Sequence, residues 1–218
     1  MEITGKDASG TSKTLLTRKD GSMIVASAST KYQETVLKGN TYSVSVSNMA
    51  LIAANAIVTA VDATAKPIIG IYNPSTSNKN LVILQSVLSI TKLSDSAVAP
   101  GGFMWVGSSG NAGISTGTTN VGVNLLNLKT TGSVSYMFTG NIALTGLTNS
   151  LSNIRPVSVP VINAAGSNTA TPFIQGNVVD QVDGMIIVPP GGIVGIMNQV
   201  STTTIYVSAS IVWAEQDV

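Results

Sequence analysis

Near its C-terminus the chain reads Thr204-Ile205-Tyr206-Val207-Ser208-Ala209-Ser210-Ile211-Val212-Trp213-Ala214. Apolar side chains occupy the odd positions of this stretch, and hydroxyl-bearing side chains occupy the even positions up to Ser210. Because successive side chains of a strand point to opposite faces, this period of two predicts a β-strand with one buried face. The alternation fails only at Val212 and Ala214. Trp213 falls on the apolar face, and we therefore expect it to pack in a core.

Similar strand patterns precede this stretch. Residues 41–47 alternate strictly, with Tyr42, Val44 and Val46 on one face and hydroxyl groups on the other. The remaining predicted strands are residues 67–72, 81–90, 103–106, 121–128, 133–144, 156–162, 185–188 and 193–197. Turn signals rich in Gly, Pro, Asn and Ser separate these runs at intervals of about 8–15 residues.

Some segments carry more specific predictions. Residues 81–90 form a long apolar run, which indicates a strand buried on both faces or bent by a bulge. Residues 156–162 contain prolines, which confine them to the edge of a sheet. The dipeptide Asp183-Gly184 predicts a hairpin turn, and the Gly- and Ser-rich residues 107–117 predict an exposed loop. The Ala-rich residues 49–56 favour strand or irregular structure over one or two helical turns.

About ten strands, without a convincing amphipathic helix, predict an all-β protein. The pattern fits an antiparallel β-sandwich, and the number of strands suits a jelly roll. We expect this jelly-roll-like sandwich to span residues 41–218. Residues 1–40 carry ten charged side chains, whereas the other 178 residues carry eleven. The contrast predicts an extended, charged N-terminal arm over residues 1–40, and an ordinary frayed terminus is the alternative.

The composition argues against several functions. The 218 residues include no Cys and no His, so disulfides, thiolate-bound metals, thiol nucleophiles and the usual general base near neutral pH are missing. The net charge is +1, with no basic stripe for nucleic acid. The longest mostly apolar stretch, residues 49–61, is too short for a transmembrane helix. We therefore expect no enzyme, no catalytic, cofactor or metal site, and no nucleic-acid or membrane partner.

Some residues nevertheless match parts of reactive motifs. Gly113-Ile114-Ser115-Thr116-Gly117 has the spacing of a hydrolase nucleophile elbow, but the chain has no histidine to activate the serine. Asp180, Asp183 and Asn177 could offer oxygen ligands to Ca²⁺, but the other ligands of an EF-hand loop are missing. Paired carboxylates from Asp180, Asp183 or Glu215 could hydrolyse glycosides if they faced each other across a cleft. We favour a chance match for the nucleophile-elbow pattern and a strand-to-turn segment for Asp180 and Asp183. We expect no glycoside hydrolysis from the carboxylates.

Four aromatic side chains could form a stacking platform for sugars: Trp105, Trp213, Tyr206 and Tyr136. The register of Trp213 favours core packing for that residue, while the short strand around Trp105 leaves both roles open. Only 5% of the residues are aromatic, which leaves little material for an extended glycan site.

Several segments together resemble structural proteins of tailed-bacteriophage virions. They are Gly70-Ile71-Tyr72-Asn73-Pro74, Lys79-Asn80-Leu81-Val82-Ile83-Leu84, the loop Ser108-Ser109-Gly110-Asn111 with Ser115-Thr116-Gly117-Thr118-Thr119, Asp183-Gly184-Met185-Ile186-Ile187-Val188-Pro189-Pro190-Gly191-Gly192, and Ser210-Ile211-Val212-Trp213-Ala214-Glu215. The likeness covers approximately residues 65–216 and leaves residues 1–64 outside it. It transfers no functional residues to this chain.

The resemblance implies a non-enzymatic virion protein with a jelly-roll-like sandwich. From it we expect a capsid cement or decoration protein on the capsid surface, made in the host cytoplasm. Its expected partners are the major capsid protein and further copies of itself in a homotrimer. A tail, neck or fibre component, or a glycan-binding appendage, is the alternative on the same fold. A β-sandwich glycosidase is a third hypothesis.

Overall fold

The structure, a computed structural model, describes residues 3–6, 12–15, 32–51, 66–93, 102–111, 122–130, 132–139, 144, 146–157, 177–199 and 205–218. The chain divides into two compact units, Met1–Glu34 and Thr35–Val218. In the first unit, β1 (Ile3–Lys6) pairs antiparallel with β2 (Ser12–Leu15). A helix of five residues, α1 (Gln33–Leu37), precedes the strands of the second unit along the chain. The N-terminal arm over residues 1–40 stays a prediction.

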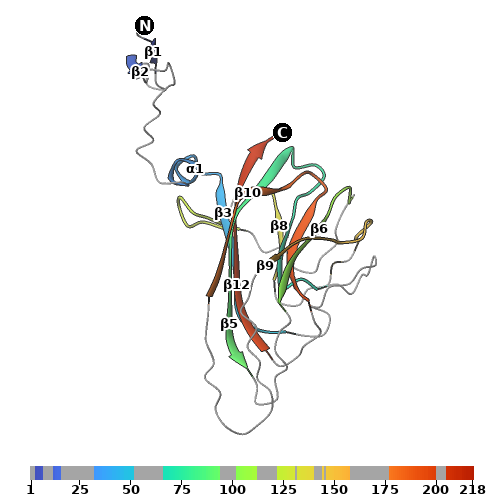
Figure 1. Ribbon diagram of the computed structural model, residues 1–218. Helices are drawn as coiled ribbons and strands as arrows, with labels where there is room; N and C mark the ends of the chain where they lie inside the picture. The colour runs from blue at the N-terminus through green and yellow to red at the C-terminus, as the bar shows by residue number, and fades with distance from the viewer. Residues whose placement is uncertain are drawn as a thin grey trace. The chain divides into compact units, whose positions relative to one another are not determined.

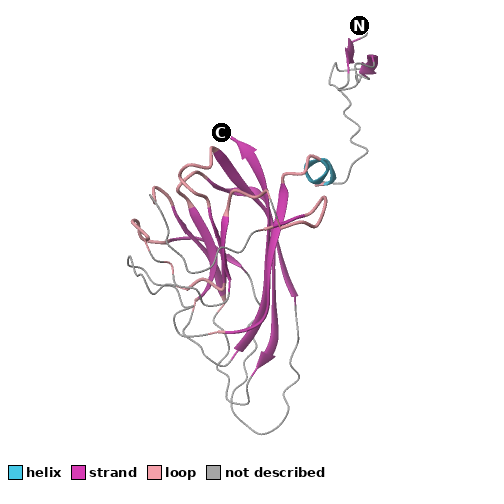
Figure 2. Ribbon diagram, turned by 180° about the vertical axis from the view of Figure 1, so that it is seen from behind, coloured by secondary structure: helices cyan, strands magenta, loops and turns pink. Residues whose placement is uncertain are grey.

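The second unit contains two antiparallel sheets of five strands each, packed face to face (Figures 1 and 2). The first sheet has the order β10-β5-β12-β3-β7 and the second the order β8-β4-β11-β6-β9. The strands of the first are β3 (Thr41–Ala50), β5 (Lys79–Leu93), β7 (Val123–Asn124), β10 (Asn177–Val188) and β12 (Ile205–Asp217). Those of the second are β4 (Ile69–Tyr72), β6 (Phe103–Ser108), β8 (Tyr136–Thr139), β9 (Ser152–Val157) and β11 (Ile193–Asn198). The predicted all-β sandwich of about ten strands is confirmed.

The connections are those of a jelly roll. The first long strand pairs with the last, and the pairs then nest inward as β3 with β12, β4 with β11, β5 with β10 and β6 with β9. Such nesting arises when one long antiparallel ribbon folds over on itself into two sheets. β7 and β8 extend the two sheets beyond β3 and β4. The sandwich therefore has two open sides, which we call the β7/β8 side and the β9/β10 side after their edge strands.

The hydrophobic core lies between the two sheets. Val207, Ile211 and Trp213 of β12 are fully buried, as the alternation in the sequence predicts. Tyr42 and Val44 on the neighbouring β3 are also buried. The rings of Tyr42 and Trp213 stack with centroids 6.0 Å apart. Burial of these side chains, together with the rest of the core, stabilises the sandwich, because the hydrophobic effect scales with the apolar area removed from water.

The sequence left two alternatives for residues 81–90, a strand buried on both faces and a strand bent by a bulge. The structure shows both features in this run. The first four residues of this run are all buried. Between Val212 and Trp213 the register of β12 on β5 skips Leu84, so that Leu84 forms a bulge. The bulge changes which side chains face the core, from odd positions before it to even positions after it. A strand with a strict period of two could not bury both halves of this run.

The hairpin turn predicted at Asp183-Gly184 is wrong. β10 is one strand, and it pairs with β5 on both sides of this dipeptide. The register shifts between Gln181 and Ile186, so Asp183 and Gly184 lie in a bulge with φ values of 54° and 82°. Asp and Gly tolerate positive φ in a bulge as well as in a turn. The dipeptide alone therefore could not distinguish the two.

Other predicted segments differ in extent from the structure. Residues 156–157 of the predicted edge strand 156–162 belong to β9, which begins at Ser152 and lies at a sheet edge as expected, and residues 158–162 lie outside the described part. In the described parts of the runs 121–128 and 133–144, the short strands β7 and β8 are the only strands. Within residues 107–117, the first two residues belong to β6, and residues 112–117 lie outside the described part. Residues 49–50 end β3, and residues 52–65 also lie outside the described part.

Candidate functional site

The two tryptophans pack in the interior and cannot stack on a sugar. Trp105 and Trp213 are both fully buried. Tyr206 is partly buried on β12. Tyr136 is 41% exposed, and its ring stacks on that of Tyr72 with centroids 6.3 Å apart. Of the four aromatic residues considered from the sequence, Tyr136 is the exposed one.

Asp180 joins the edges of the two sheets. Nε1 of Trp105 donates a hydrogen bond to its Oδ2 at 2.8 Å, and the Arg155 guanidinium forms an ion pair with its Oδ1. Asp180 lies on β10, whereas Trp105 and Arg155 lie on β6 and β9 of the other sheet. Both carboxylate oxygens thus bind donors of the protein itself. We call this set of three residues the Asp180 clamp.

Asp183 and Asn177, the other candidate metal ligands of the sequence, lie on the same strand as Asp180 and are exposed. Among the described residues, no three His, Cys, Asp or Glu side chains lie close enough together to hold a metal ion. This arrangement agrees with the interpretation of Asp180 and Asp183 as residues of a strand, with a bulge in place of the expected turn.

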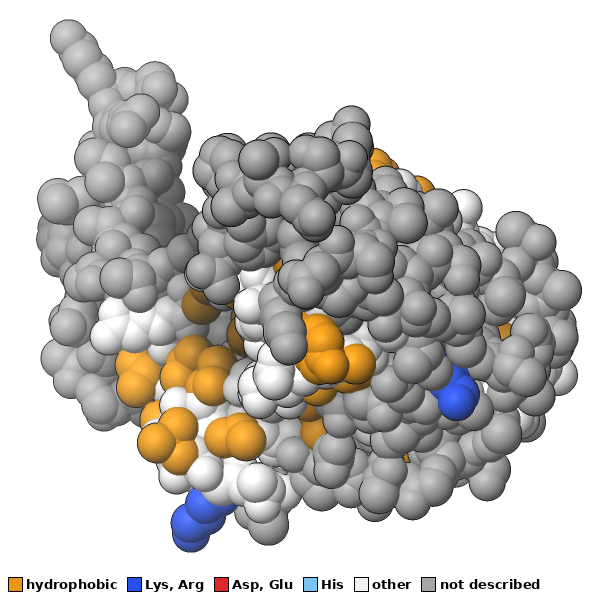
Figure 3. Space-filling view, turned by 90° about the horizontal axis from the view of Figure 1, so that it is seen from below, with side chains coloured by type: hydrophobic (Ala, Val, Ile, Leu, Met, Phe, Trp, Pro, Cys, Tyr) orange, Lys and Arg blue, Asp and Glu red, His pale blue; other side chains and the backbone are white. Residues whose placement is uncertain are grey.

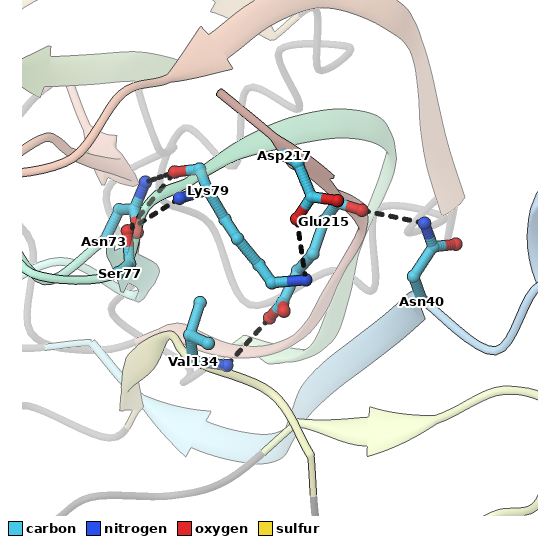
Figure 4. A network of polar contacts seen from close by, with 7 residues as sticks. All are labelled: Asn40, Asn73, Ser77, Lys79, Val134, Glu215 and Asp217. Atoms are coloured by element: carbon cyan, nitrogen blue, oxygen red, sulfur yellow. Dashed lines mark hydrogen bonds and ion pairs between the residues drawn. The ribbon is translucent and has the colours of Figure 1, made fainter.

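Glu215 is a buried carboxylate that holds a loop against the C-terminal strand. Its Oε1 accepts hydrogen bonds from Ser133 Oγ at 2.7 Å and from the backbone N–H of Val134 at 3.0 Å, and Figure 4 shows the latter contact. Its backbone oxygen accepts a hydrogen bond from Asn40 Nδ2 at 2.8 Å. Nearby, Lys79 and Asp217 form an ion pair at 3.4 Å. These contacts give Glu215 a structural role, because a buried carboxylate is stable only when donors satisfy it.

Tyr42 provides a test of this region at high pH. Burial and the negative charge of Glu215 raise the pKa of the Tyr42 phenol above its usual value of 10.0. Above pH 10 the unfolded chain therefore loses this proton more readily than the folded chain, and stability falls as the pH rises toward the folded pKa. We expect Tyr42→Phe to flatten this alkaline decline, measured by urea unfolding from pH 8 to 11. Tyr136→Phe is the control, and an equal flattening there would contradict the prediction.

Two asparagines tie together the loops at one end of the sandwich. Asn73 Nδ2 donates hydrogen bonds to the backbone oxygens of Lys79 at 2.7 Å and Val188 at 2.9 Å. Asn111 Oδ1 accepts hydrogen bonds from the backbone N–H groups of Thr148 and Asn149. Both asparagines are buried. These roles are not visible in the sequence, because asparagine in a turn-rich segment is ordinary loop composition.

Gly191 links the two asparagines. Its N–H donates to Asn73 O at 2.8 Å, and its oxygen accepts from Asn111 N at 3.0 Å. Gly191 has a φ of 76°, and a Cβ at this position would lie 3.0 Å from Asn111 O. Only glycine adopts this conformation at such a short distance without strain. Three of the segments that carry the phage resemblance therefore meet at this point.

We expect Asn111→Ala to lower the free energy of unfolding by about 2 kcal/mol, because two backbone N–H groups lose their acceptor. Amide hydrogen exchange should accelerate most at Thr148 and Asn149, the two residues that Asn111 holds. Asn149→Ala removes an exposed side chain whose bond goes to Ser109 O, and we expect its effect to stay within about 0.5 kcal/mol. Equal losses in the two variants would rule out this role for Asn111.

A groove of about 530 Å³ lies on the β9/β10 side. Its lining combines serine and asparagine side chains of β6, β9 and the adjacent loops with isoleucine and valine side chains of β9, β10 and β11, and none of its residues is charged. Ile187 and Ile154 in this lining remain 56% and 44% exposed. Met185 on β10, just before the lining residues, is also exposed. Such a surface fits an uncharged, partly apolar occupant.

An apolar turn projects from the β7/β8 side. Residues 125–128 follow β7, and Leu126 and Leu128 are 48% and 74% exposed. Asn124 fixes the turn, since its Oδ1 accepts from Leu126 N at 2.9 Å and its backbone oxygen accepts from Leu128 N at 2.8 Å. Leu128 has a φ of 59°, which costs about 1–2 kcal/mol for a residue with a side chain. The hydrogen bonds therefore hold two leucines in a fixed, solvent-facing position.

The described surface carries few charges. Figure 3 shows the molecule from below, where apolar and uncharged polar side chains predominate among the described residues and basic side chains are isolated. Within the described part of the chain, no helix has the length and apolar composition needed to cross a membrane. The nucleophile-elbow pattern at residues 113–117 lies outside the described residues.

No family model, curated protein or solved structure matches the chain.

Proposed function

We propose that this chain is a non-enzymatic structural protein of a tailed-bacteriophage virion. The observation that carries the proposal is the contrast between the interior and the surface of the sandwich. The carboxylates of Asp180 and Glu215 are engaged in structural hydrogen bonds, whereas Leu128 and Ile187 project apolar side chains from the two open sides. A protein whose work is to bury surface against neighbours needs such apolar contacts and no reactive centre. The phage source is supported by the sequence resemblance.

Within the virion, we place the protein on the capsid surface as a cement or decoration protein. It would bind the major capsid protein, associate with itself as a homotrimer and bridge neighbouring capsid subunits. Its contribution to the head would be additive interface area, with each interface burying on the order of 1,600 Å² of total surface. The low charge of the body supports this placement, because a surface shared with neighbours does not need charges for solubility.

The test compares virions with and without the protein. Particles that lack it should release DNA at a lower temperature and after a milder osmotic shock, as followed with a DNA-binding dye. Quantitative protein analysis of purified virions should find hundreds of copies. Unchanged stability together with a few to a few dozen copies would contradict the cement role and indicate a tail, neck or fibre component.

A glycan-binding appendage is the second candidate, and Tyr136 is the observation that favours it. Its partly exposed ring, stacked on Tyr72, could support a sugar. The burial of Trp105 removes the other aromatic that the sequence offered nearby. Binding of host-surface glycans that is lost in Tyr136→Ala and kept in Tyr136→Phe would support this candidate, whereas no binding by the parent chain would exclude it.

A further inference from the structure

The groove and the apolar turn lie on opposite open sides of the same sandwich. The turn follows β7, which is one edge of the sheet β10-β5-β12-β3-β7, whereas the groove includes residues of β10, the other edge. Four interstrand spacings separate these two edges, which corresponds to about 19 Å. Because the hydrogen bonds to Asn124 fix the turn, one chain cannot place its own turn in its own groove.

We propose that the apolar turn of one copy docks in the groove of a second copy, so that identical chains associate head to tail. This inference deepens the proposed function. It rests on one part of that proposal, namely that copies of the chain associate with one another. Because the turn and the groove are different surfaces, each copy uses both, and the assembly either closes into a ring or grows as a filament. The proposed homotrimer is a ring of this kind.

The chemistry of the two surfaces matches. Leu126 and Leu128 are apolar and held in position, which keeps the entropic cost of docking low. The groove offers isoleucine and valine side chains with hydroxyl and amide groups beside them, and it contains no charge that would have to be desolvated. Outside the apolar turn, Lys129 follows directly and is exposed. Turn-to-turn contact would bring the Lys129 charges of two copies together, whereas the lining of the groove carries no charge that would repel Lys129.

Addition of a strand to a sheet edge fits the structure less well than side-chain docking. β9 carries Arg155 and Pro156, which disfavour edge pairing. β10 is interrupted by the bulge between Gln181 and Ile186. β7 has two residues and β8 has four, so neither offers a long edge. Contacts between copies are therefore expected through side chains that project from the open sides.

The absence of cysteine from the chain makes a direct test possible. Leu128→Cys places a thiol on the turn, and Ile187→Cys places one in the groove. We mix the two variants with a short bis-maleimide cross-linker and separate the products by denaturing electrophoresis. A cross-linked dimer should form in the mixture, and much less should form in either variant alone. The control replaces Leu128→Cys by Val218→Cys, since Val218 is exposed but belongs to neither surface, and no dimer should form.

A second experiment compares the dissociation constant between copies of the parent chain with that of variants that carry serine on either surface. The double substitution Leu126→Ser with Leu128→Ser, and separately Ile187→Ser, should each raise the dissociation constant between copies at least about tenfold. Light scattering after size exclusion measures this constant, and Val218→Ser should leave it unchanged. Circular dichroism confirms that each variant is folded, which the exposed positions of these side chains favour.

Three results would overturn the inference. The parent chain could stay monomeric at all concentrations, or Leu128→Cys could cross-link mainly to itself, or the groove could bind the major capsid protein while the copies do not associate. These outcomes are separate from failure of the proposed function. A head-to-tail oligomer without any effect on virion stability would support the docking and contradict the cement role.

Discussion

Replacing Asp180 with alanine is expected to lower the free energy of unfolding by about 3 kcal/mol. The substitution leaves the Arg155 guanidinium and the Trp105 Nε1 without the acceptor that joins β10 to the opposite sheet. Removal of one partner from a buried ion pair costs about 3–5 kcal/mol, because the other charge stays desolvated. The Arg155 side chain keeps 29% of its surface exposed, so water compensates part of this loss, and the lower end of the range applies.

Chemical denaturation of three variants tests the prediction. Asp180→Asn keeps an acceptor for Trp105 but loses the charge opposite Arg155, and we expect an intermediate loss. Asp217→Asn is the control, because it removes a 90% exposed carboxylate whose ion pair with Lys79 lies at the surface, and its effect should stay within about 1 kcal/mol. If Asp180→Ala were no more destabilising than Asp217→Asn, the Asp180 clamp would not hold the sheets together.

The strands were predictable because their signal is local. The alternation around Trp213 and around Val44 predicts which side chains are buried, and the structure confirms both. Turn signals between apolar runs predict the number of strands and hence the sandwich. The jelly-roll suggestion came from that count, whereas the strand order depends on contacts between distant residues. The pairing of β3 with β12 shows this, because Ser43 lies opposite Val212.

The bulges show where local patterns fail. At Asp183-Gly184 the sequence predicts a hairpin turn, but both residues adopt positive φ in a bulge, and the chain does not reverse there. The partner strand β5 decides this, and it pairs with residues before and after the dipeptide. At Leu84 the sequence allows a bulge, and only the register on β12 shows that one is present. Strand boundaries and bulges thus depend on the partner strand as much as on the strand itself.

The candidate sites were less predictable than the fold. The Asp180 clamp joins residues separated by 75 and 25 positions in the chain, so no spacing rule could reveal it. Asn111 looks like any other loop asparagine until its two backbone donors are placed beside it. The apolar turn lies in residues 121–128, which the sequence predicts as a strand. Leu126 and Leu128 are exposed because Asn124 ends β7 early and turns the chain.

The groove and the Asp180 clamp share the edge strands β9 and β10. Ile154 of the groove is the chain neighbour of Arg155 in the clamp, and both lie on β9. The clamp holds the edge of one sheet at a fixed separation from the edge of the other, and residues of both edges line the groove. In the proposed head-to-tail assembly, loss of the clamp is therefore expected to weaken the association between copies as well as to lower the free energy of unfolding. Asp180→Asn should remain folded. It is therefore the variant in which to measure the free energy of unfolding and the dissociation constant between copies.

The largest loss of stability is expected for Trp213→Ala, at about 3–5 kcal/mol, because truncation of a buried Trp leaves a large cavity. Trp213 is fully buried and stacks on Tyr42. Among the described residues its Nε1 has no hydrogen-bond partner, so a smaller apolar ring forfeits contacts but no hydrogen bond. We therefore expect Trp213→Phe to cost clearly less than Trp213→Ala. Equal losses in these two variants would show that the site cannot repack around a phenyl ring.

Gly122 provides a second, independent measure of this packing. A Cβ at Gly122 would lie 2.6 Å from Cη2 and 2.7 Å from Cζ2 of Trp213, which is too close without a shift of the ring. Gly122→Ala alone should therefore cost about 1–3 kcal/mol through overpacking. In the Trp213→Phe background those two ring atoms are gone, and the same substitution should cost less. Additive losses in this double-mutant cycle would mean that Trp213 does not limit the space at Gly122 and that Tyr42 Cβ, 3.2 Å from the same added Cβ, does, since residues in direct contact are expected to couple.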